Sequence, residues 1–337
     1  MKKDFLTIAD WSGKELLQIL DLSKKMKANP KKYAKSLEGK SVALIFEKHS
    51  LRTHVTFEIG IKQLGAHTVY LTNADINLGK RESMYDVAKN LERWVDAVVV
   101  RTFAQKNVDD LAQFAKASIV NALTDFEHPC QAVGDFLTIQ EHLGSFKGKK
   151  FAWVGDGNNV CHSLMLLASK VGMNFTAVTP AGHLPDANVV ILAKEIAAST
   201  GTKVELVAHP AEGVRDADVI YTDVWVSMGQ ETDREAKMKA FAGFQVNTLL
   251  MKHAKPTAVF MHCLPAHRGE EVTDEVMDSP QSIVFDEAEN RLHTQKAILY
   301  TLLKGQSREK LNTGGRRRKL AHSRGTTRNN SRAARKR

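Results

Sequence analysis

The chain has 337 residues and a formal net charge of +10 at pH 7, from 48 Lys and Arg against 38 Asp and Glu. A hydrophobic content of 43% is typical of a globular protein, and this length favours two domains over one. No apolar run approaches the ~20 residues that span a bilayer, and no signal segment follows Met1, so we expect a cytoplasmic protein without membrane contact. The three cysteines, Cys130, Cys161 and Cys263, are no disulfide framework and fit a reducing compartment.

The positive charge is concentrated near the C-terminal end. Residues 304–337 contain 13 Lys and Arg and one acid, Glu309, which leaves 35 basic and 37 acidic side chains in 1–303. This segment lacks aromatic residues and apolar periodicity, which predicts a basic, disordered tail. We interpret it as a solvated appendage, and its run of four basic residues at 316–319 leaves nucleic-acid binding open through the tail alone.

Strand and helix patterns alternate through the first part of the chain. Apolar, β-branched runs predict strands over 41–46, 68–71, 97–100 and 118–122. Helical periodicity is found over 53–64, 84–93, 109–115 and 131–143. The segment 144–150 follows, with two glycines and three lysines, and we place a domain boundary there.

The same alternation then restarts. Strands are predicted over 150–155, 175–179, 204–208, 219–222, 258–262 and 282–286. Helices are predicted over 160–171, 188–199, 232–241 and 289–303. The fold class is therefore α/β, with two doubly wound parallel-sheet domains over 1–143 and 144–288, and we expect the active site in the cleft between them.

Polar residues that follow the strands of the first domain suggest an anion site. Ligands in doubly wound sheets bind beyond the carboxyl ends of the strands. Backbone N–H groups, hydroxyls and guanidinium groups at such places favour phosphate, although helix capping explains a Ser or Thr equally well. The candidate residues are Ser50, Arg52, Thr53, Arg101, His128 and Gln131.

The second domain offers polar groups at three strand ends. The motif Val-Gly-Asp-Gly-Asn-Asn-Val at 154–160 matches a dinucleotide fingerprint poorly, because Val160 replaces the third glycine, and leaves Asn159 facing the crevice. Asp223 and Ser227 follow a later strand and could bind a substrate ammonium, while a turn or cap also explains Asp223. Cys263 is open to three interpretations, a thiolate base, a nucleophile or a small apolar residue, and no spacing supports a metal site.

Taken together, these motifs resemble the aspartate/ornithine carbamoyltransferase family over residues 4–303. The family order is a phosphate loop, His-Pro-x-Gln at 128–131, Gly-Asp-Gly-Asn-Asn at 155–159, Asp-Val-Trp-Val-Ser-Met-Gly at 223–229, His-Cys-Leu-Pro at 262–265 and Glu-Asn-Arg at 289–291. The motifs at 223–229 and 262–265 are similar to those of the ornithine branch of the family. The resemblance implies transfer of a carbamoyl group from carbamoyl phosphate to the δ-amine of L-ornithine, giving L-citrulline and phosphate, with no metal or cofactor.

The resemblance also implies site residues. Arg101, His128 and Cys263 would be catalytic, and ornithine would be held by Asn159, Asp223, Ser227 and Met228. Carbamoyl phosphate would contact Ser50, Leu51, Arg52, Thr53, Asn77, Arg101, His128, Gln131, Cys263, Leu264 and Arg291. The Leu264–Pro265 bond would be cis, and the helix over 289–303 would pack back on the first domain.

The family is built on homotrimers or larger assemblies of trimers with sites at subunit interfaces, and we expect the same here. Asn77 stands where the family usually has a Gln that crosses the interface, and Leu51 and His54 replace the family's Thr and Arg in the phosphate loop. Leu51 lacks the hydroxyl of Thr, so the binding of carbamoyl phosphate loses one neutral hydrogen bond, which contributes about 0.5–1.5 kcal/mol. The alternative function is carbamoyl transfer to another amine, such as putrescine or an acylated ornithine, against which Asp223 and Ser227 argue because they suit a free amino acid.

Overall fold

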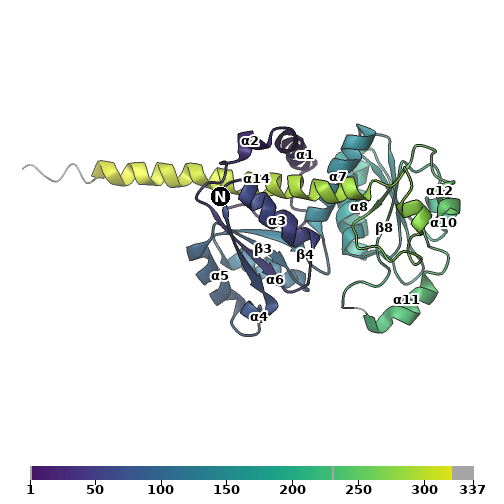
Figure 1. Cartoon of the computed structure of the whole chain (residues 1–337), viewed down its shortest axis with the longest axis horizontal. Coiled ribbons are helices and arrows are strands. Elements are labelled where there is room, and N and C mark those ends of the chain that lie inside the picture. Colours follow the sequence, from purple (N-terminus) through teal and green to yellow (C-terminus); the bar gives the residue numbers. More distant parts are fainter. Residues whose placement is uncertain (1, 230, 321–337) are drawn as a thin grey trace, which may run out of the picture.

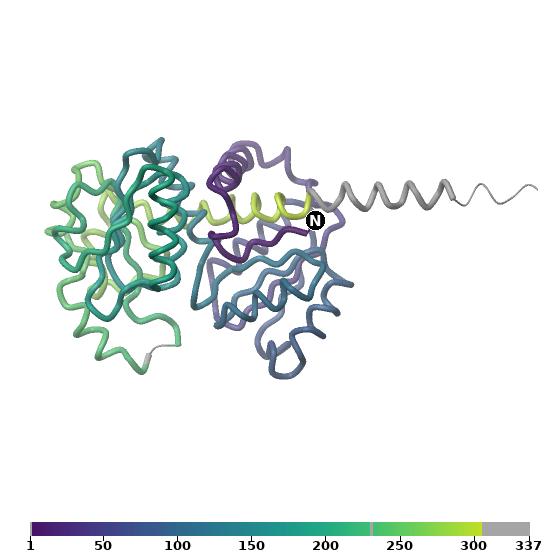
Figure 2. Tube along the Cα trace, turned by 180° about the vertical axis from the view of Figure 1, so that it is seen from behind, coloured from purple at the N-terminus to yellow at the C-terminus, as the bar shows by residue number. Residues whose placement is uncertain are grey.

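Two α/β units lie side by side, and the long helix α14 (Val284–Leu320) runs from one of them across the other (Figure 1, Figure 2). The computed structural model describes residues 2–229 and 231–320, with side chains up to Lys304 apart from that of Glu231. Within those residues, no helix combines the length and the apolar character needed to cross a bilayer.

The first unit contains a four-stranded parallel sheet in the order β2-β1-β3-β4. Its strands are β1 (Ser41–Phe46), β2 (His67–Thr72), β3 (Ala97–Arg101) and β4 (Ser118–Leu123). Its helices are α1 (Gly13–Ala28), α2 (Pro30–Tyr33), α3 (Arg52–Gln63), α4 (Asn73–Ile76), α5 (Met84–Trp94), α6 (Gln105–Phe114) and α7 (Pro129–Leu143). The strand order reverses between β1 and β3, which is where such sheets open a crevice for a ligand.

The second unit contains a five-stranded parallel sheet in the order β7-β6-β5-β8-β9. Its strands are β5 (Lys150–Val154), β6 (Asn174–Val178), β7 (Val204–Val207), β8 (Val219–Thr222) and β9 (Val259–His262). Its helices are α8 (Asn159–Val171), α9 (Ala187–Thr200), α10 (Pro210–Gly213), a 3-10 turn (Glu231–Asp233), α11 (Arg234–Ala240), α12 (Thr248–Met251) and α13 (Asp274–Met277). The two sheets confirm the predicted fold class.

Helices α7 and α8 form the centre of the molecule. Every residue of α7 from Pro129 to Ile139 is buried, and so is every residue of α8 from Val160 to Ser169. A helix that is buried on all sides must have packing partners on all sides. Each covers its own sheet, they pack against each other, and one continuous apolar cluster includes residues of both units. This shared core fixes how the two sheets face each other.

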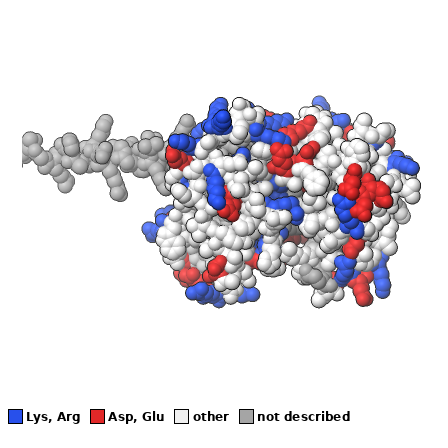
Figure 3. Space-filling model, in the orientation of Figure 1, with Lys and Arg blue, Asp and Glu red and all other residues white. Residues whose placement is uncertain are grey.

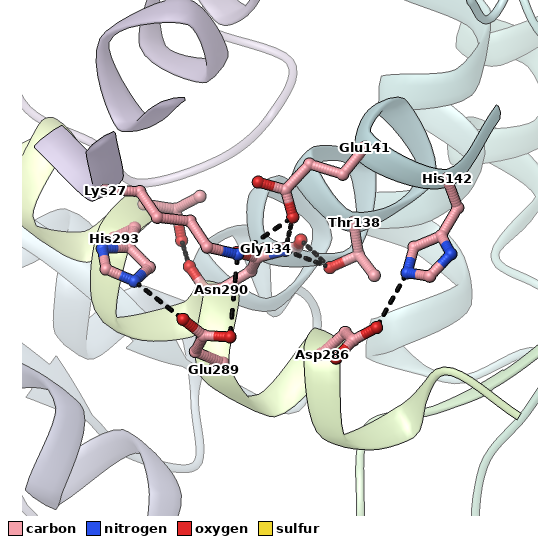
Figure 4. Close-up of polar contacts among 10 residues, drawn as sticks. Lys27, Gly134, Thr138, Glu141, His142, Asp286, Glu289, Asn290 and His293 are labelled. Carbon is pink, nitrogen blue, oxygen red and sulfur yellow. Dashed lines mark hydrogen bonds and ion pairs between the residues drawn. The ribbon is translucent and has the colours of Figure 1, made fainter. Parts of the chain in front are cut away.

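Helix α14 is docked on α7 and α1 by a polar cluster around Asn290 (Figure 4). The fully buried Asn290 amide donates to Thr138 Oγ1 at 2.9 Å and to Glu141 Oε2 at 2.8 Å, and its oxygen accepts from Lys27 Nζ at 2.9 Å. One turn earlier, His142 and Asp286 pair at 2.8 Å near the exposed rim. Because a buried amide must be hydrogen-bonded, this cluster fixes the register of α14 along α7.

Three features differ from the sequence prediction. Helix α1 was not predicted, although Ser12 and Glu15 form a capping box at its start. The predicted strand over 282–286 is wrong: Ser282 makes only an isolated bridge to Phe260, and α14 begins at Val284, with acidic residues in its first turn that favour a helix start.

The third difference concerns the end of the chain. The prediction of disorder begins at residue 304, whereas the backbone is helical as far as Leu320. This stretch includes Gln, Glu, Lys and Arg, which have high intrinsic helix propensity. The rest of the predicted tail, 321–337, lies outside the described residues.

Candidate active site

Four cationic or potentially cationic side chains meet at the carboxyl edge of the first sheet. Arg52 opens α3, Arg101 ends β3, His128 directly precedes α7, and Arg291 reaches in from α14. The parallel register sets Phe46 opposite Arg101, so the loop after β1 and the end of β3 are neighbours. In the space-filling view, Lys and Arg side chains are visible in the hollow between the two units (Figure 3).

This cluster is electrostatically uncompensated. Arg101 Nε, His128 Nδ1 and Arg291 Nε are buried and have no hydrogen-bond partner among the described residues. Burial lowers the pKa of Arg101 to about 10, and repulsion from Arg291 and Arg52 adds to the effect. Burial and the three arginines also hold the pKa of His128 well below 6.5, so its imidazole is neutral at pH 7. Orphaned donors around concentrated positive charge are groups that a small anion would satisfy, and we call this cluster the anion site.

The start of α3 and helix α14 are linked directly behind this site. Arg291 donates from Nη2 to Thr53 Oγ1 at 2.9 Å and from Nη1 to Gln131 Oε1. Ser50 Oγ accepts from Thr53 N at 3.2 Å, which orders the loop that precedes the helix. Leu51 points away from the core and is 73% exposed, so only its backbone can serve an anion. Gln131 therefore lies behind Arg291, with both ends of its amide engaged by protein groups.

Across the hollow, Asp223 and Cys263 lie side by side at the ends of β8 and β9. The register pairs Thr222 with His262, which makes the next residue of each strand a neighbour. Cys263 Sγ donates to Asp223 Oδ1 at 3.0 Å, and Asn158 Nδ2 donates to Asp223 Oδ2 at 2.9 Å. Sequence reasoning selected Asn159 and missed Asn158, which also caps α8 through its side-chain oxygen.

Burial, with the carboxylates of Asp223 and Glu287, raises the pKa of Cys263 well above its usual value, which favours the thiol form. Of the three interpretations open at the sequence level, this direction disfavours a standing thiolate. The next peptide bond, Leu264–Pro265, is cis, as the resemblance implies, and Leu264 has a φ of 60°. Leu264 N donates to His262 Nδ1 at 2.9 Å, which fixes the backbone beside Cys263.

Asp223, His262 and Cys263 each present a potential metal-ligand atom, and these atoms lie within 4.8 Å of one another. They come from two strand ends, which is why no sequence spacing indicated them. Each group is nevertheless engaged within the protein, His262 with Leu264 N and Glu271 and the other two with each other. We assign no metal to the site.

The remaining predicted residues fall into two groups. Asn159 Nδ2 crosses between the units and donates to Thr124 O at 2.6 Å. Ser227 and Met228 lie in the loop after β8, and Met228 is 48% exposed. This loop approaches the first unit, because a Cβ on Gly229 would lie 3.8 Å from the ring of Phe103.

Asn77 is separate from all of these residues. It has a left-handed φ of 44°, ends α4 and bonds to residues of its own loop, Asn73, Lys80 and Arg81. Nothing among the described contacts joins it to the anion site of the same chain.

Glu127 was missed by sequence reasoning. Its Oε2 accepts from Ile8 N at 3.0 Å and from Ser163 Oγ at 2.9 Å, and Ser163 Oγ in turn accepts from His128 N at 2.9 Å. Glu127 therefore positions the His128 backbone through a residue of the other unit. Burial raises the pKa of Glu127 to about 7. No local pattern marks this residue, because its partners are distant in sequence.

Comparison with known proteins places this geometry in a family. The family model "Aspartate/ornithine carbamoyltransferase, carbamoyl-P binding domain" matches residues 3–141, and the model "Asp/Orn binding domain" of the same family matches residues 147–302. The first match covers Arg52, Arg101 and His128 of the cationic cluster, and the second covers Asp223, Cys263 and Arg291. The chain therefore belongs to the aspartate/ornithine carbamoyltransferase family.

The chain is similar to ornithine carbamoyltransferases from several organisms. The chain is similar to an ornithine carbamoyltransferase of Pyrococcus horikoshii, with 51% identity over 305 residues, 90% of this chain and 96% of the relative. It is 48% identical over 302 residues to an ornithine carbamoyltransferase of Bacillus cereus, covering 90% and 95% of the two chains. The solved ornithine carbamoyltransferase of Pyrococcus furiosus superposes with a TM-score of 0.87 at 49% identity, covering 90% of this chain and 97% of that one.

Glu127 makes the stability of the protein depend on pH in a specific direction. Its pKa is about 4.5 when unfolded and about 7 when folded, so the native state holds the extra proton between these values and stability falls as pH rises through this window. Glu127→Gln keeps an oxygen acceptor and cannot ionise. Relative to wild type, the variant should gain on the order of 2–3 kcal/mol of unfolding free energy between pH 5 and pH 8.

Urea unfolding at several pH values measures this difference. The matched control is Glu38→Gln, the same substitution at an exposed position. A Glu127→Gln difference that is constant from pH 5 to pH 8 would contradict the assignment of a protonated buried carboxyl.

Proposed function

We propose that the protein transfers the carbamoyl group of carbamoyl phosphate to the δ-amine of L-ornithine, producing L-citrulline and phosphate. The observation that carries the proposal is the uncompensated cluster of Arg52, Arg101, His128 and Arg291, facing Asp223 and Cys263 across the hollow. The cluster suits a phosphorylated, doubly charged substrate, and the opposite wall suits an amino acid. Membership of the family and the names of relatives at about 50% identity support both assignments.

In this proposal the first unit stabilises the charge that develops during transfer. As the δ-amine attacks the carbamoyl carbon, negative charge grows on the carbonyl oxygen, and Arg101, neutral His128 and the Thr53 hydroxyl donate to it. Arg52, Arg291 and the backbone around Ser50 and Leu51 bind the phosphate as it leaves. Gln131 contributes by fixing the Arg291 guanidinium. Phosphate is a good leaving group, so these groups suffice without a cofactor.

The second unit orients the amino acid. The Asp223 carboxylate accepts from Cys263, Asn158 and its neighbour Val224 N, so it is fixed before ornithine binds and presents a negative charge to the α-ammonium. Asn159, Ser227 and Met228 provide further polar groups and the covering loop. Holding both substrates in the orientation for attack makes the bimolecular reaction effectively unimolecular. An ornithine acylated on its α-amine lacks the free α-ammonium that Asp223 would bind. Putrescine keeps an ammonium at that position and lacks the α-carboxylate of an amino acid.

Arg52 is the most direct test of the anion site. Arg52→Ala removes a guanidinium that stabilises the leaving phosphate, and kcat/KM for citrulline formation should fall by about a thousandfold or more. A colorimetric citrulline assay measures it. Arg93→Ala, an exposed arginine on α5 of the same unit, is the control and should match wild type. Near-full activity in Arg52→Ala would sink the site assignment.

We propose further that the active form is a homotrimer, or an assembly of trimers, in which Asn77 completes the site of a neighbouring copy. Strand β2 is an edge strand whose outward residues are exposed, and unpaired edges invite coverage. Exposed apolar side chains of β2 and α3 adjoin it: Leu51, Val55, Ile59, Val69 and Tyr70. His54, which replaces the family's Arg, stacks on Tyr70 with ring centroids 3.8 Å apart, so this departure serves packing.

A charge in this patch tests the assembly. Ile59 is 41% exposed, and Ile59→Glu should convert the trimer to monomers in sedimentation velocity and lower citrulline formation at least tenfold, because Asn77 no longer reaches a site. Ile191→Glu is the matched control, an isoleucine 56% exposed on α9 of the other unit, and should remain trimeric. A monomeric, fully active wild type would contradict the shared site.

The three cysteines support a cytoplasmic location for this enzyme. Cys130, Cys161 and Cys263 are all free. Burial raises the pKa of Cys130 to about 12, so it is inert as a nucleophile and serves packing. Free thiols in all three positions fit a reducing compartment.

A further inference from the structure

Two buried carboxyl groups meet behind the anion site, Asp135 of α7 and Glu287 of α14, and they are 0% and 1% exposed. Gln131 Nε2 donates to Asp135 Oδ1 at 2.7 Å and to Glu287 Oε1 at 3.0 Å. Tyr221 Oη, from β8 of the other unit, lies 3.2 Å from Asp135 Oδ2 and 3.0 Å from Glu287 Oε1. Glu287 Oε2 accepts from His262 N at 3.0 Å. The pair thus joins α7, α14 and two strands of the second sheet.

This pair has no cation in direct contact among the described residues. The charged and titratable groups around it are Arg291, which binds Gln131 instead, the Tyr221 phenol, the Cys263 thiol and His262, whose ring binds Glu271. Burial raises the pKa of Asp135 to about 7, and burial together with Asp135 raises the pKa of Glu287 well above its usual value. Two carboxylates this close cannot both ionise, so the pair holds one proton at neutral pH.

We propose that the Asp135–Glu287 pair, sharing one proton, is a positioning device for carbamoyl transfer. It touches neither substrate. The pair binds Gln131, and Gln131 binds the Arg291 guanidinium. Glu287 also binds His262 N, so the pair fixes the position of Arg291 relative to the end of β9, where Cys263 lies. The proposal rests on the function proposed above, because it assigns the pair a part in binding carbamoyl phosphate.

The geometry gives the device a specific consequence. Arg291 sits one helical turn after Glu287 on α14, so any displacement of Glu287 from Asp135 is carried to the guanidinium. When alkaline pH removes the shared proton, two buried carboxylates repel each other and the contact between α7 and α14 loosens. The KM for carbamoyl phosphate should therefore rise at alkaline pH, while kcat at saturating carbamoyl phosphate changes less.

Two variants of Glu287 separate positioning from mere packing. Glu287→Gln keeps an oxygen for His262 N and offers Asp135 an amide donor in place of the shared proton, so its KM for carbamoyl phosphate should not rise between about pH 7 and pH 9. Glu287→Ala leaves His262 N without its acceptor and Gln131 Nε2 with Asp135 alone, and its KM should be raised about tenfold at every pH. The control is Asp286→Asn, next in sequence and paired with His142 at the rim, which should follow wild type.

The result that overturns the proposal is a Glu287→Ala variant that folds and has a KM within twofold of wild type. A Glu287→Gln variant with the same alkaline rise as wild type also overturns it. Should Glu287→Ala fail to fold, Glu287→Gln alone still decides through its pH profile.

Two further measurements do not depend on turnover. The infrared difference between wild type and Glu287→Gln at pH 7 should show the carbonyl stretch of one protonated carboxyl, lost in the variant and retained in Asp286→Asn. Calorimetric titration with inorganic phosphate should show weaker binding to Glu287→Ala. If wild type forms no citrulline, the proposed function fails, and these two measurements still test the pair; absence of both differences would overturn it.

Discussion

Buried positive charge that has no counter-ion in the described part of the protein is the constraint on which the rest of this structure depends. Arg101, His128 and Arg291 each leave a buried nitrogen without a partner among the described residues. Burial, together with repulsion from neighbouring arginines, lowers the pKa of Arg101, of Arg291 and of His128. Such a cluster is costly in an empty protein, since each orphaned donor forfeits the hydration that it had when unfolded. The surrounding fold must hold these groups together against their repulsion.

The fold does this by bringing distant segments to one edge. Parallel strands deliver Arg101 and the loops before α3 and α7 to the same end of the first sheet, and the buried pair of helices α7 and α8 sets the second sheet opposite. Helix α14 then crosses from the second unit and inserts Arg291, with its register along α7 fixed by Asn290 and Glu287. The groups behind the arginines are the neutral Gln131 and Thr53 and the proton-sharing pair Asp135 and Glu287. They do not neutralise the arginines by direct contact, so the positive charge stays available to a substrate.

How far the sequence predicts this arrangement depends on the range of the interactions. The parallel sheets and the residues that follow their strands could be read from local patterns, and these residues include Arg52, Arg101 and His128. Arg291 lies within α14 and was indicated only by the motifs in the family order. The N-terminal helix α1 had a readable signal in its Ser12 and Glu15 capping box. The β-branched run at 282–286 favoured a strand locally, and packing of Ile283 and Val284 at the start of α14 overrode it.

The second layer of the site could not be predicted in the same way. Glu127 works through Ser163, and Asp135 works through Glu287 and Tyr221, at separations of 36, 152 and 86 residues along the chain. A carboxyl in a helix that reads as apolar gives no sign of its partner before the fold is known. Asn77 illustrates a further limit, because the hydrogen bonds of Asn77 within the described part of the chain stay inside its own loop and do not reach the anion site.

The central claim is that the orphaned cations form a specific site for carbamoyl phosphate, and its effect on stability tests this most directly. Urea unfolding of the full chain at 25 °C should show a rise in unfolding free energy that grows with carbamoyl phosphate concentration, reaching about 2.7 kcal/mol at a hundred times the dissociation constant. Sodium chloride at matched ionic strength should give a much smaller rise. Equal stabilisation by both, or none by carbamoyl phosphate, would contradict the account.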